Sequence, residues 1–201
     1  MIPTDAATLK VVLAHGAEDA RTILREALIQ LHYHNLRICS SGRELIALTH
    51  EIEPDLIITG VDLPDVDGVS ALLEISQRHK IPAIVVTQQA SLQTVERALE
   101  DHVMAYLLEP VNTDEIMPTI YLVLRRFEQF QELEQENESL KQALADRKVI
   151  DRAKGALMKQ AGIDEETAYK RLRRMATDNR IRMAEAADQI LAVIGLIEAE
   201  K

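Results

Sequence analysis

The chain has 201 residues, 47% of them apolar, so it is long enough for one medium and one small domain with hydrophobic cores. A single cysteine excludes a disulfide framework and a cysteine-based zinc site, and no apolar run approaches the roughly 18 residues of a membrane span. The net charge of −10 is uneven, because residues 1–146 carry 11 basic and 24 acidic side chains whereas residues 147–182 carry 11 basic and 5 acidic ones. This asymmetry favours an acidic regulatory module joined to a nucleic-acid-binding unit, although chance clustering on a solvated surface is an alternative.

Short apolar runs alternate with helical patterns over the first 110 residues. The apolar runs predict five strands, at residues 9–15, 36–39, 55–60, 81–87 and 103–108. Apolar residues at helical spacing predict helices at 18–31, 43–52, 69–79 and 91–100, the first with Ile23, Ala27 and Leu31 on one apolar stripe. Strands that are apolar on both faces and alternate with helices indicate a doubly wound α/β domain with a parallel sheet, whose functional loops follow the carboxyl ends of the strands.

Three segments at those loops resemble the receiver domain of response regulators: PDLIITGVDLPDVDG at 54–68, AIVVTQQA at 83–90 and MAYLLEP at 104–110. The turn from Pro64 to Gly68, Thr87, Tyr106 and Pro110 all match the family pattern. The resemblance covers roughly residues 9–125 and implies a flavodoxin-like fold.

The residues that a receiver domain uses for phosphoryl transfer are all replaced. His15 and Gly16 stand in place of the acidic pair that holds Mg²⁺, Gly60 in place of the phosphoryl-accepting aspartate, and Glu109 in place of the lysine. The reaction needs a metal on oxygen ligands and positive charge at the phosphoryl oxygens, and a glutamate repels phosphate. We therefore predict a degenerate pocket at His15, Gly16, Gly60, Thr87 and Glu109, without catalysis, metal or cofactor. An ion pair or proton-linked contact between His15 and Glu109 is a further hypothesis.

Asp62, two residues beyond Gly60, is the alternative phosphoryl acceptor, with Glu18 and Asp19 as metal ligands. The competing interpretation is that the aspartates of this loop, Asp62, Asp65 and Asp67, are turn and cap residues whose short side chains bond the backbone.

The lone cysteine and a close pair of histidines offer no site of their own. Cys39 lies in an apolar run, so we expect a buried structural thiol rather than a nucleophile. His32 and His34 suggest a metal pair, but no partners with ligand spacing follow, so we expect surface or partly packed histidines. The first eight residues are polar and small, so we expect no signal peptide and a cytoplasmic protein.

Residues 117–147 form a predicted long helix that joins two different modules. A heptad seam runs along it, with Phe130, Asn137 and Leu144 at a positions and Leu133 and Leu140 at d positions. A single asparagine among apolar a positions fixes the register of a parallel two-stranded coiled coil, so we predict a homodimer. The alternative is one amphipathic helix packed on its own domain.

Three further helices are predicted at residues 149–162, 164–177 and 183–199. Gly162 suits the residue after the first of them and Asp164 suits the N-cap of the second, while Asp178 and Asn179 mark a turn. The predicted inward residues are Ile150, Ala153, Leu157 and Ala161 on the first helix, Ala168, Leu172, Met175 and Ala176 on the second, and Ala187, Ile190, Leu191 and Ile194 on the third.

This segment resembles the ANTAR domain, the RNA-binding module of transcription antiterminators. The resemblance rests on the run RAKGALM at 152–158, followed by Ala168-Tyr169 and Leu172-Arg173. The family's Ala-Met near the end of the second helix appears here in reverse order, as Met175-Ala176. The resemblance implies binding to paired stem-loops of a nascent messenger RNA leader, which prevents a terminator hairpin.

Basic residues crowd this small unit, and cations on a rigid surface bind phosphates with a salt-dependent affinity. Tyr169 is either a base-stacking residue or half-buried packing. The predicted RNA-binding residues are Arg152, Lys154, Lys159, Tyr169, Lys170, Arg171, Arg173, Arg174, Arg180 and Arg182.

The sequence thus predicts a non-enzymatic, dimeric antitermination regulator, controlled by a partner protein instead of phosphorylation. Its domains would be a receiver-like domain at 1–116, a coiled coil at 117–147 and a three-helix RNA-binding domain at 148–201. The alternatives are a DNA-binding response regulator and a phosphotransfer protein that uses Asp62.

Overall fold

The computed structural model of the protein describes residues 6–88 and 103–199 and divides into two compact units, Met1–Glu132 and Leu133–Lys201. Each unit is described by itself. The predicted helix at residues 91–100 lies outside the described residues. No helix in the described part of the chain is long and apolar enough to cross a membrane.

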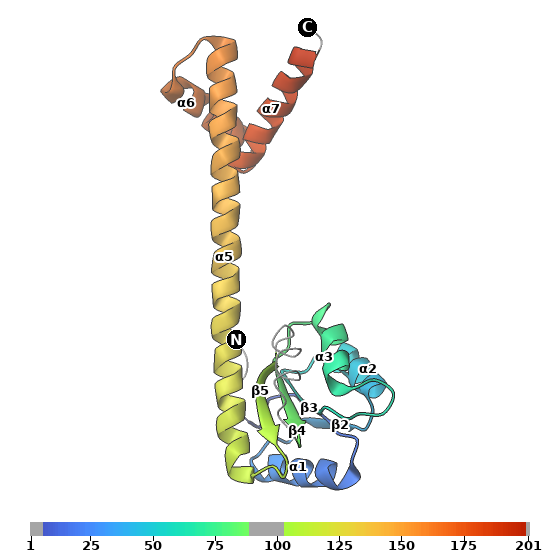
Figure 1. The fold of residues 1–201 in the computed structure, drawn as a ribbon. Coiled ribbons are helices and arrows are strands. Elements are labelled where there is room, and N and C mark those ends of the chain that lie inside the picture. Colours follow the sequence, from blue (N-terminus) through green and yellow to red (C-terminus); the bar gives the residue numbers. More distant parts are fainter. Residues whose placement is uncertain (1–5, 89–102, 200–201) are drawn as a thin grey trace. The chain divides into compact units, whose positions relative to one another are not determined.

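The first unit is a five-stranded parallel sheet with helices between its strands (Figure 1). The strands are ordered β2-β1-β3-β4-β5, so the chain starts near one edge and crosses over to the other, and the predicted doubly wound α/β fold is confirmed. The strands are β1 (Val11–Ala14), β2 (Leu36–Cys39), β3 (Leu56–Gly60), β4 (Ala83–Thr87) and β5 (Val103–Leu108). The helices are α1 (Glu18–Gln30), α2 (Gly42–Ile52), α3 (Gly68–Ser76) and the first part of α5 (Thr113–Ala161).

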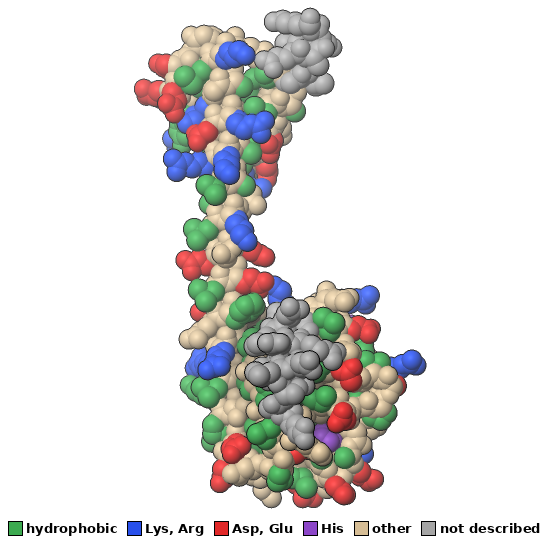
Figure 2. Space-filling model, viewed as in Figure 1, with side chains coloured by type: hydrophobic (Ala, Val, Ile, Leu, Met, Phe, Trp, Pro, Cys, Tyr) green, Lys and Arg blue, Asp and Glu red, His purple; other side chains and the backbone are tan. Residues whose placement is uncertain are grey.

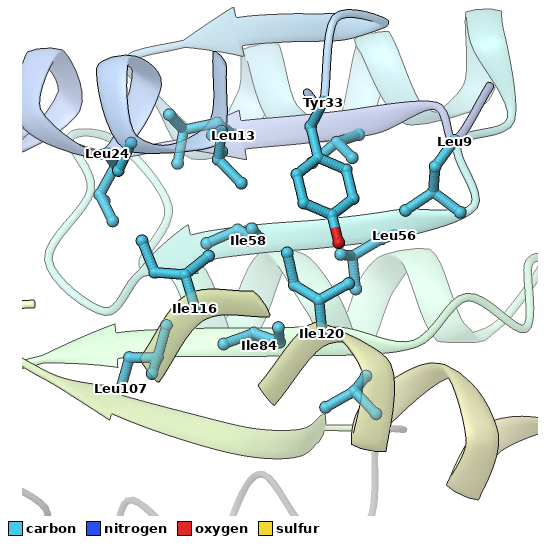
Figure 3. Packing of buried hydrophobic residues seen from close by; sticks show 14 of the residues in the cluster. Leu9, Leu13, Leu24, Tyr33, Leu56, Ile58, Ile84, Leu107, Ile116 and Ile120 are labelled. Carbon is cyan, nitrogen blue, oxygen red and sulfur yellow. The ribbon is translucent and has the colours of Figure 1, made fainter. Parts of the chain in front are cut away.

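Both faces of the sheet are buried, because successive strand residues point to opposite sides. On β1, Val11 and Leu13 pack in a cluster with α1 and α5, whereas Val12 and Ala14 pack in a cluster with α2 and α3. Figure 3 shows the first cluster, in which Ile116 and Ile120 of α5 lie over strand residues such as Ile58.

One residue of the apolar stripe predicted on α1 does not face the core. The buried residues of α1 are Leu24, Ala27 and Leu28, whereas Ile23 is 57% exposed. The prediction for Ile23 is therefore wrong. The helix has apolar residues on more sides than it buries, so periodicity alone did not select the inner stripe.

The second unit consists of the rest of α5 with α6 (Glu165–Asn179) and α7 (Met183–Ala199) (Figure 1). Its core is small and rich in alanine, which lets the helices approach closely. The fully buried cluster is Ala153, Leu172, Ala176, Ala186 and Ala187.

The helix ends of this unit agree with the sequence except at one turn. Gly162 has a φ of 62° directly after α5, and the Asp164 carboxylate accepts a hydrogen bond of 2.7 Å from the Thr167 N–H. The turn predicted at Asp178 and Asn179 is wrong, because both belong to α6, and the chain reverses at Arg180 with a φ of 54°.

Two other expectations for this unit are corrected. The helices predicted at 117–147 and 149–162 are one unbroken helix, α5. Ala161, predicted to point inward, is exposed, because α5 ends there beyond the contact with the other two helices.

Candidate functional site

The residues of the predicted degenerate pocket stand at one edge of the sheet. His15 directly follows β1, Gly60 and Thr87 end β3 and β4, and Glu109 directly follows β5. Because the strands are parallel, their carboxyl ends share this edge. The Glu109 N–H donates to the Thr87 carbonyl at 2.9 Å, which ties the last two loops together.

His15 and Glu109 form a shielded pair in this pocket. The Nε2 atom of His15 lies 2.8 Å from Oε1 of Glu109, and the two side chains are only 10% and 17% exposed. The Nδ1 atom of His15 accepts a hydrogen bond from the Ala17 N–H at 3.1 Å, which orients the ring. Glu109 places a carboxylate in this pocket, where a phosphoryl group needs positive charge.

The glycines of the pocket are closely covered. A β-carbon on Gly60 would lie 2.7 Å from Cδ2 of His15, and one on Gly16 would lie 2.5 Å from the carbonyl oxygen of Asp62. The imidazole therefore occupies the space into which a side chain at residue 60 would extend.

The aspartates of the loop after β3 have separate roles. Asp65, with a φ of 68°, accepts hydrogen bonds from the N–H groups of Gly42, Arg43 and Val66. Some loss of hydration acts to raise the pKa of the exposed Asp65, but these hydrogen bonds outweigh it and hold the pKa below its usual value. Asp67 caps α3 by accepting from the Ser70 N–H at 3.0 Å. The turn-and-cap interpretation is confirmed for these two.

Asp62 lies exposed in the loop beyond β3, off the strand end where Gly60 stands. Among the described residues, no group of three or more histidine, cysteine or carboxylate side chains is placed to hold a metal ion. Arg21, which the sequence analysis did not single out, donates to the carbonyl oxygens of His15 at 2.6 Å and Gly16 at 3.2 Å. This arginine fixes the loop that carries His15.

A hollow of about 460 Å³ opens beside the pocket. Its walls are mainly apolar and include Ile23 of α1, Pro110 and Val111, while Glu109 contributes a carboxylate. The exposed position of Ile23 thus places it at the rim of this hollow.

The predicted dimerisation residues all lie on α5 with their side chains in solvent. Phe130, Leu133, Leu140 and Leu144 are between 43% and 65% exposed, and Asn137 is exposed as well. Exposure of large apolar side chains to water is unfavourable in free energy, and packing against a partner helix would bury them.

Lys154 differs from the other predicted RNA-binding residues. Its ammonium group lies 2.8 Å from Oδ1 of Asp151 and 2.8 Å from Oε1 of Glu165, and its side chain is only 16% exposed. These hydrogen bonds, to Asp151 first and Glu165 second, raise the pKa of Lys154 above its usual value. Lys154 therefore joins α5 to α6.

The remaining predicted RNA-binding cations fall into two groups; Figure 2 shows Lys and Arg side chains in blue on the surface of this unit. Lys170, Arg174 and Arg182 pair with carboxylates on the surface. The others are exposed and have no carboxylate partner within the described ranges; we call them the free cations, and they are Arg152, Lys159, Arg171, Arg173 and Arg180. Tyr169 is 43% exposed, one turn before Arg173 on α6.

Two family models match the chain, the response regulator receiver domain over residues 11–121 and the ANTAR domain over residues 138–191. The chain is a response regulator with an ANTAR domain. The transcriptional regulatory protein PdtaR of Mycobacterium tuberculosis is 33% identical to this response regulator over 92% of the chain and 91% of PdtaR. The transcriptional regulatory protein KdpE of Staphylococcus aureus is 30% identical over 57% of the chain and 50% of KdpE.

Solved structures share the fold of the first unit of this response regulator. A signal receiver domain of an HD domain-containing protein from Pseudomonas fluorescens Pf-5 has a TM-score of 0.55 at 23% identity, covering 60% of this chain and 98% of that one. A DNA-binding response regulator of the LuxR family from Staphylococcus aureus has a TM-score of 0.51 at 27% identity, covering 58% and 98%.

Proposed function

We propose that this response regulator is a transcription antiterminator that binds stem-loops of nascent messenger RNA leaders and works without phosphorylation of its receiver domain. The free cations on the ANTAR-matched unit are the observation that carries the RNA-binding part. A cation without a carboxylate partner has no ion pair to break before it meets a phosphate.

The free cations are arranged for a nucleic-acid backbone. Arg152 and Lys159 stand two turns apart on α5, Arg171 and Arg173 lie on α6, and Arg180 occupies the turn directly after α6. Tyr169 and Arg173, one turn apart, offer an aromatic face beside a cation, which suits an unstacked base in an RNA loop.

The geometry of the pocket supports the proposal of control without phosphorylation. The His15 ring fills the space above Gly60, and Glu109 supplies negative charge where a phosphoryl group needs positive charge. We infer that a partner protein contacts the receiver domain and masks or releases the RNA-binding surface. The alternative acceptor, Asp62, belongs to no group of three or more potential metal-ligand side chains among the described residues.

We further propose that the protein is a homodimer through the seam on α5. Two chains would present two ANTAR domains, which suits a leader with two stem-loops and raises affinity through effective concentration. The exposed stripe from Phe130 to Leu144, interrupted by Asn137, supports a parallel pair of helices.

Binding of the full chain to a two-stem-loop leader RNA and to duplex DNA of equal length, over a salt series, tests this function. Tight RNA binding without a phosphodonor, weakening steeply with salt, is expected. Arg173→Ala should lower RNA affinity and reduce the salt slope by about one, whereas Arg43→Ala on the receiver domain is the matched control and should change neither. Equal, weak binding to both nucleic acids, or tighter binding to the duplex DNA, would contradict the proposal.

A further inference from the structure

Two histidines that are 29 residues apart in the sequence meet in the first unit. His50 lies in the last turn of α2, and His79 follows the end of α3. The Nδ1 atom of His50 is 2.9 Å from the Nε2 atom of His79, with the ring centroids 5.0 Å apart and the planes tilted by 48°. Helices of a parallel α/β fold run opposite to its strands, so this pair lies at the amino edge of the sheet, away from the His15–Glu109 pocket.

Two ring nitrogens at this distance share one proton, because one must donate and the other must accept. A second proton between them would set two donors face to face. When the donor imidazole carries its proton on its other nitrogen, both facing nitrogens present lone pairs and the two rings can chelate an ion.

We propose that His50 and His79 form a binding site for a divalent transition-metal ion, which replaces the shared proton. Metal–imidazole bonds are about 2.0–2.1 Å long, so two adjacent ligands at a right angle are separated by about 2.9 Å. The observed separation of 2.9 Å already has this value, and modest rotation of each ring would direct both lone pairs to one point. Imidazole ligands suit Cu²⁺, Ni²⁺ and Zn²⁺, and Cu²⁺ is expected to bind most tightly.

The surroundings of the pair favour a cation with water ligands. Both histidines stand at helix C-termini, where the partial negative charge of the backbone stabilises a positive ion. A polar hollow of about 380 Å³ adjoins His50, with Glu74 and Gln77 in its wall and room for water. Arg78 lines the same hollow, and its charge opposes the ion. No third histidine, cysteine or carboxylate completes a ligand group in the described part of the chain, so the site is expected to be exchangeable.

Metal titration of the full, untagged chain tests the proposal, after treatment with EDTA and removal of the chelator. Calorimetry with CuCl₂, NiCl₂ and ZnCl₂ should give one saturable site per chain, tightest for Cu²⁺, and the Cu²⁺ electron paramagnetic resonance spectrum should report nitrogen ligands. His50→Gln and His79→Gln should each abolish this site, and Arg78→Gln should tighten it. His34→Gln is the matched control and should keep the metal site. The His32 and His34 rings stand edge to face with centroids 5.9 Å apart, farther apart than the His50 and His79 rings, so we do not expect them to form this site.

The absence of a saturable site in the wild-type chain would overturn the proposal, as would an unchanged site in both His50→Gln and His79→Gln. Circular dichroism checks that each variant is folded. If a variant does not fold, the wild-type copper spectrum still decides, since signals from oxygen ligands alone contradict a two-histidine site. This proposal does not depend on RNA binding.

Discussion

The imidazole of His15 lies 2.8 Å from the carboxylate of Glu109 and covers the α-carbon of Gly60 so closely that a β-carbon there would approach the ring to 2.7 Å. A working receiver domain places carboxylates after its first strand and a lysine after its last. Here an imidazole, His15, follows the first strand and a carboxylate, Glu109, follows the last. The three replacements, His15, Gly60 and Glu109, are complementary because the ring occupies the space over the glycine and contacts the carboxylate.

Gly60→Asp is expected to destabilise the receiver domain instead of restoring its chemistry. The new side chain collides with the His15 ring, and overpacking of this kind costs about 1–3 kcal/mol of unfolding free energy. Denaturant unfolding measures the loss. The double variant Gly60→Asp with His15→Ala, which removes the obstructing ring, should recover part of the stability, whereas a single variant as stable as the wild type would contradict the steric argument.

Lys154→Ala is expected to act on folding before it acts on RNA. Its ammonium group joins Asp151 and Glu165 across α5 and α6, so its removal should lower the denaturant midpoint of the second unit. Lys159→Ala, the matched control, removes an exposed cation without a described carboxylate partner. It should leave the midpoint unchanged but lower RNA affinity, with a salt slope smaller by about one. An unchanged midpoint in Lys154→Ala would show that the bridge is dispensable.

Leu140→Asp is expected to convert the protein from a dimer to a monomer. The substitution places a charge at a d position of the seam, where burial against a partner helix would leave it unpaired. Sedimentation equilibrium distinguishes the two states. Ser139→Asp adds the same charge at the neighbouring, outward c position and should remain dimeric. A monomeric wild type, or a dimeric Leu140→Asp, would rule out this seam as the interface.

Cys39 is expected to be unreactive in the folded protein. Burial, with a smaller contribution from Glu44 and a small opposing one from Arg21, raises the pKa of the Cys39 thiol to about 12. A thiol reagent at pH 8 should therefore label the chain only after denaturation. Rapid labelling of the native chain at that pH would contradict the assigned burial.

The same shift predicts a pH dependence of stability. The folded-state pKa of Cys39 lies above the unfolded value of about 8.5, so its contribution is intact below that pH and declines as the pH rises toward 12. Cys39→Ala should lose this part of the decline in alkaline unfolding experiments.

Much of the fold could be predicted because strands and caps have local signals. The segment Val103–Leu108 is a continuous apolar run, Leu36–Cys39 has apolar residues on both sides of Arg37, and the structure has strands with both of these bounds. Asp164 likewise predicts the start of α6, because its side chain can accept a hydrogen bond from a backbone N–H of the first turn, here that of Thr167. The face that a helix turns to the core depends on distant segments. The sequence pattern therefore did not show that Leu24 is buried while its neighbour Ile23 is exposed.

The candidate sites depend on contacts between distant segments. The sequence predicts such contacts only where the pattern of a known family aligns the segments. The resemblance put His15 and Glu109 at one pocket, and the structure brings them together. Nothing in the sequence paired His50 with His79, and nothing distinguished Lys154 from the other cations, because its carboxylate partner Glu165 lies across a helix–helix contact.

Incubation with acetyl phosphate and Mg²⁺, followed by intact mass and RNA affinity measurements on the same sample, tests most directly whether the receiver domain acts without phosphorylation. The account predicts no added phosphoryl mass and the same RNA affinity before and after treatment. A mass increase of one phosphoryl group that disappears in Asp62→Asn, together with a change in RNA affinity, would contradict it.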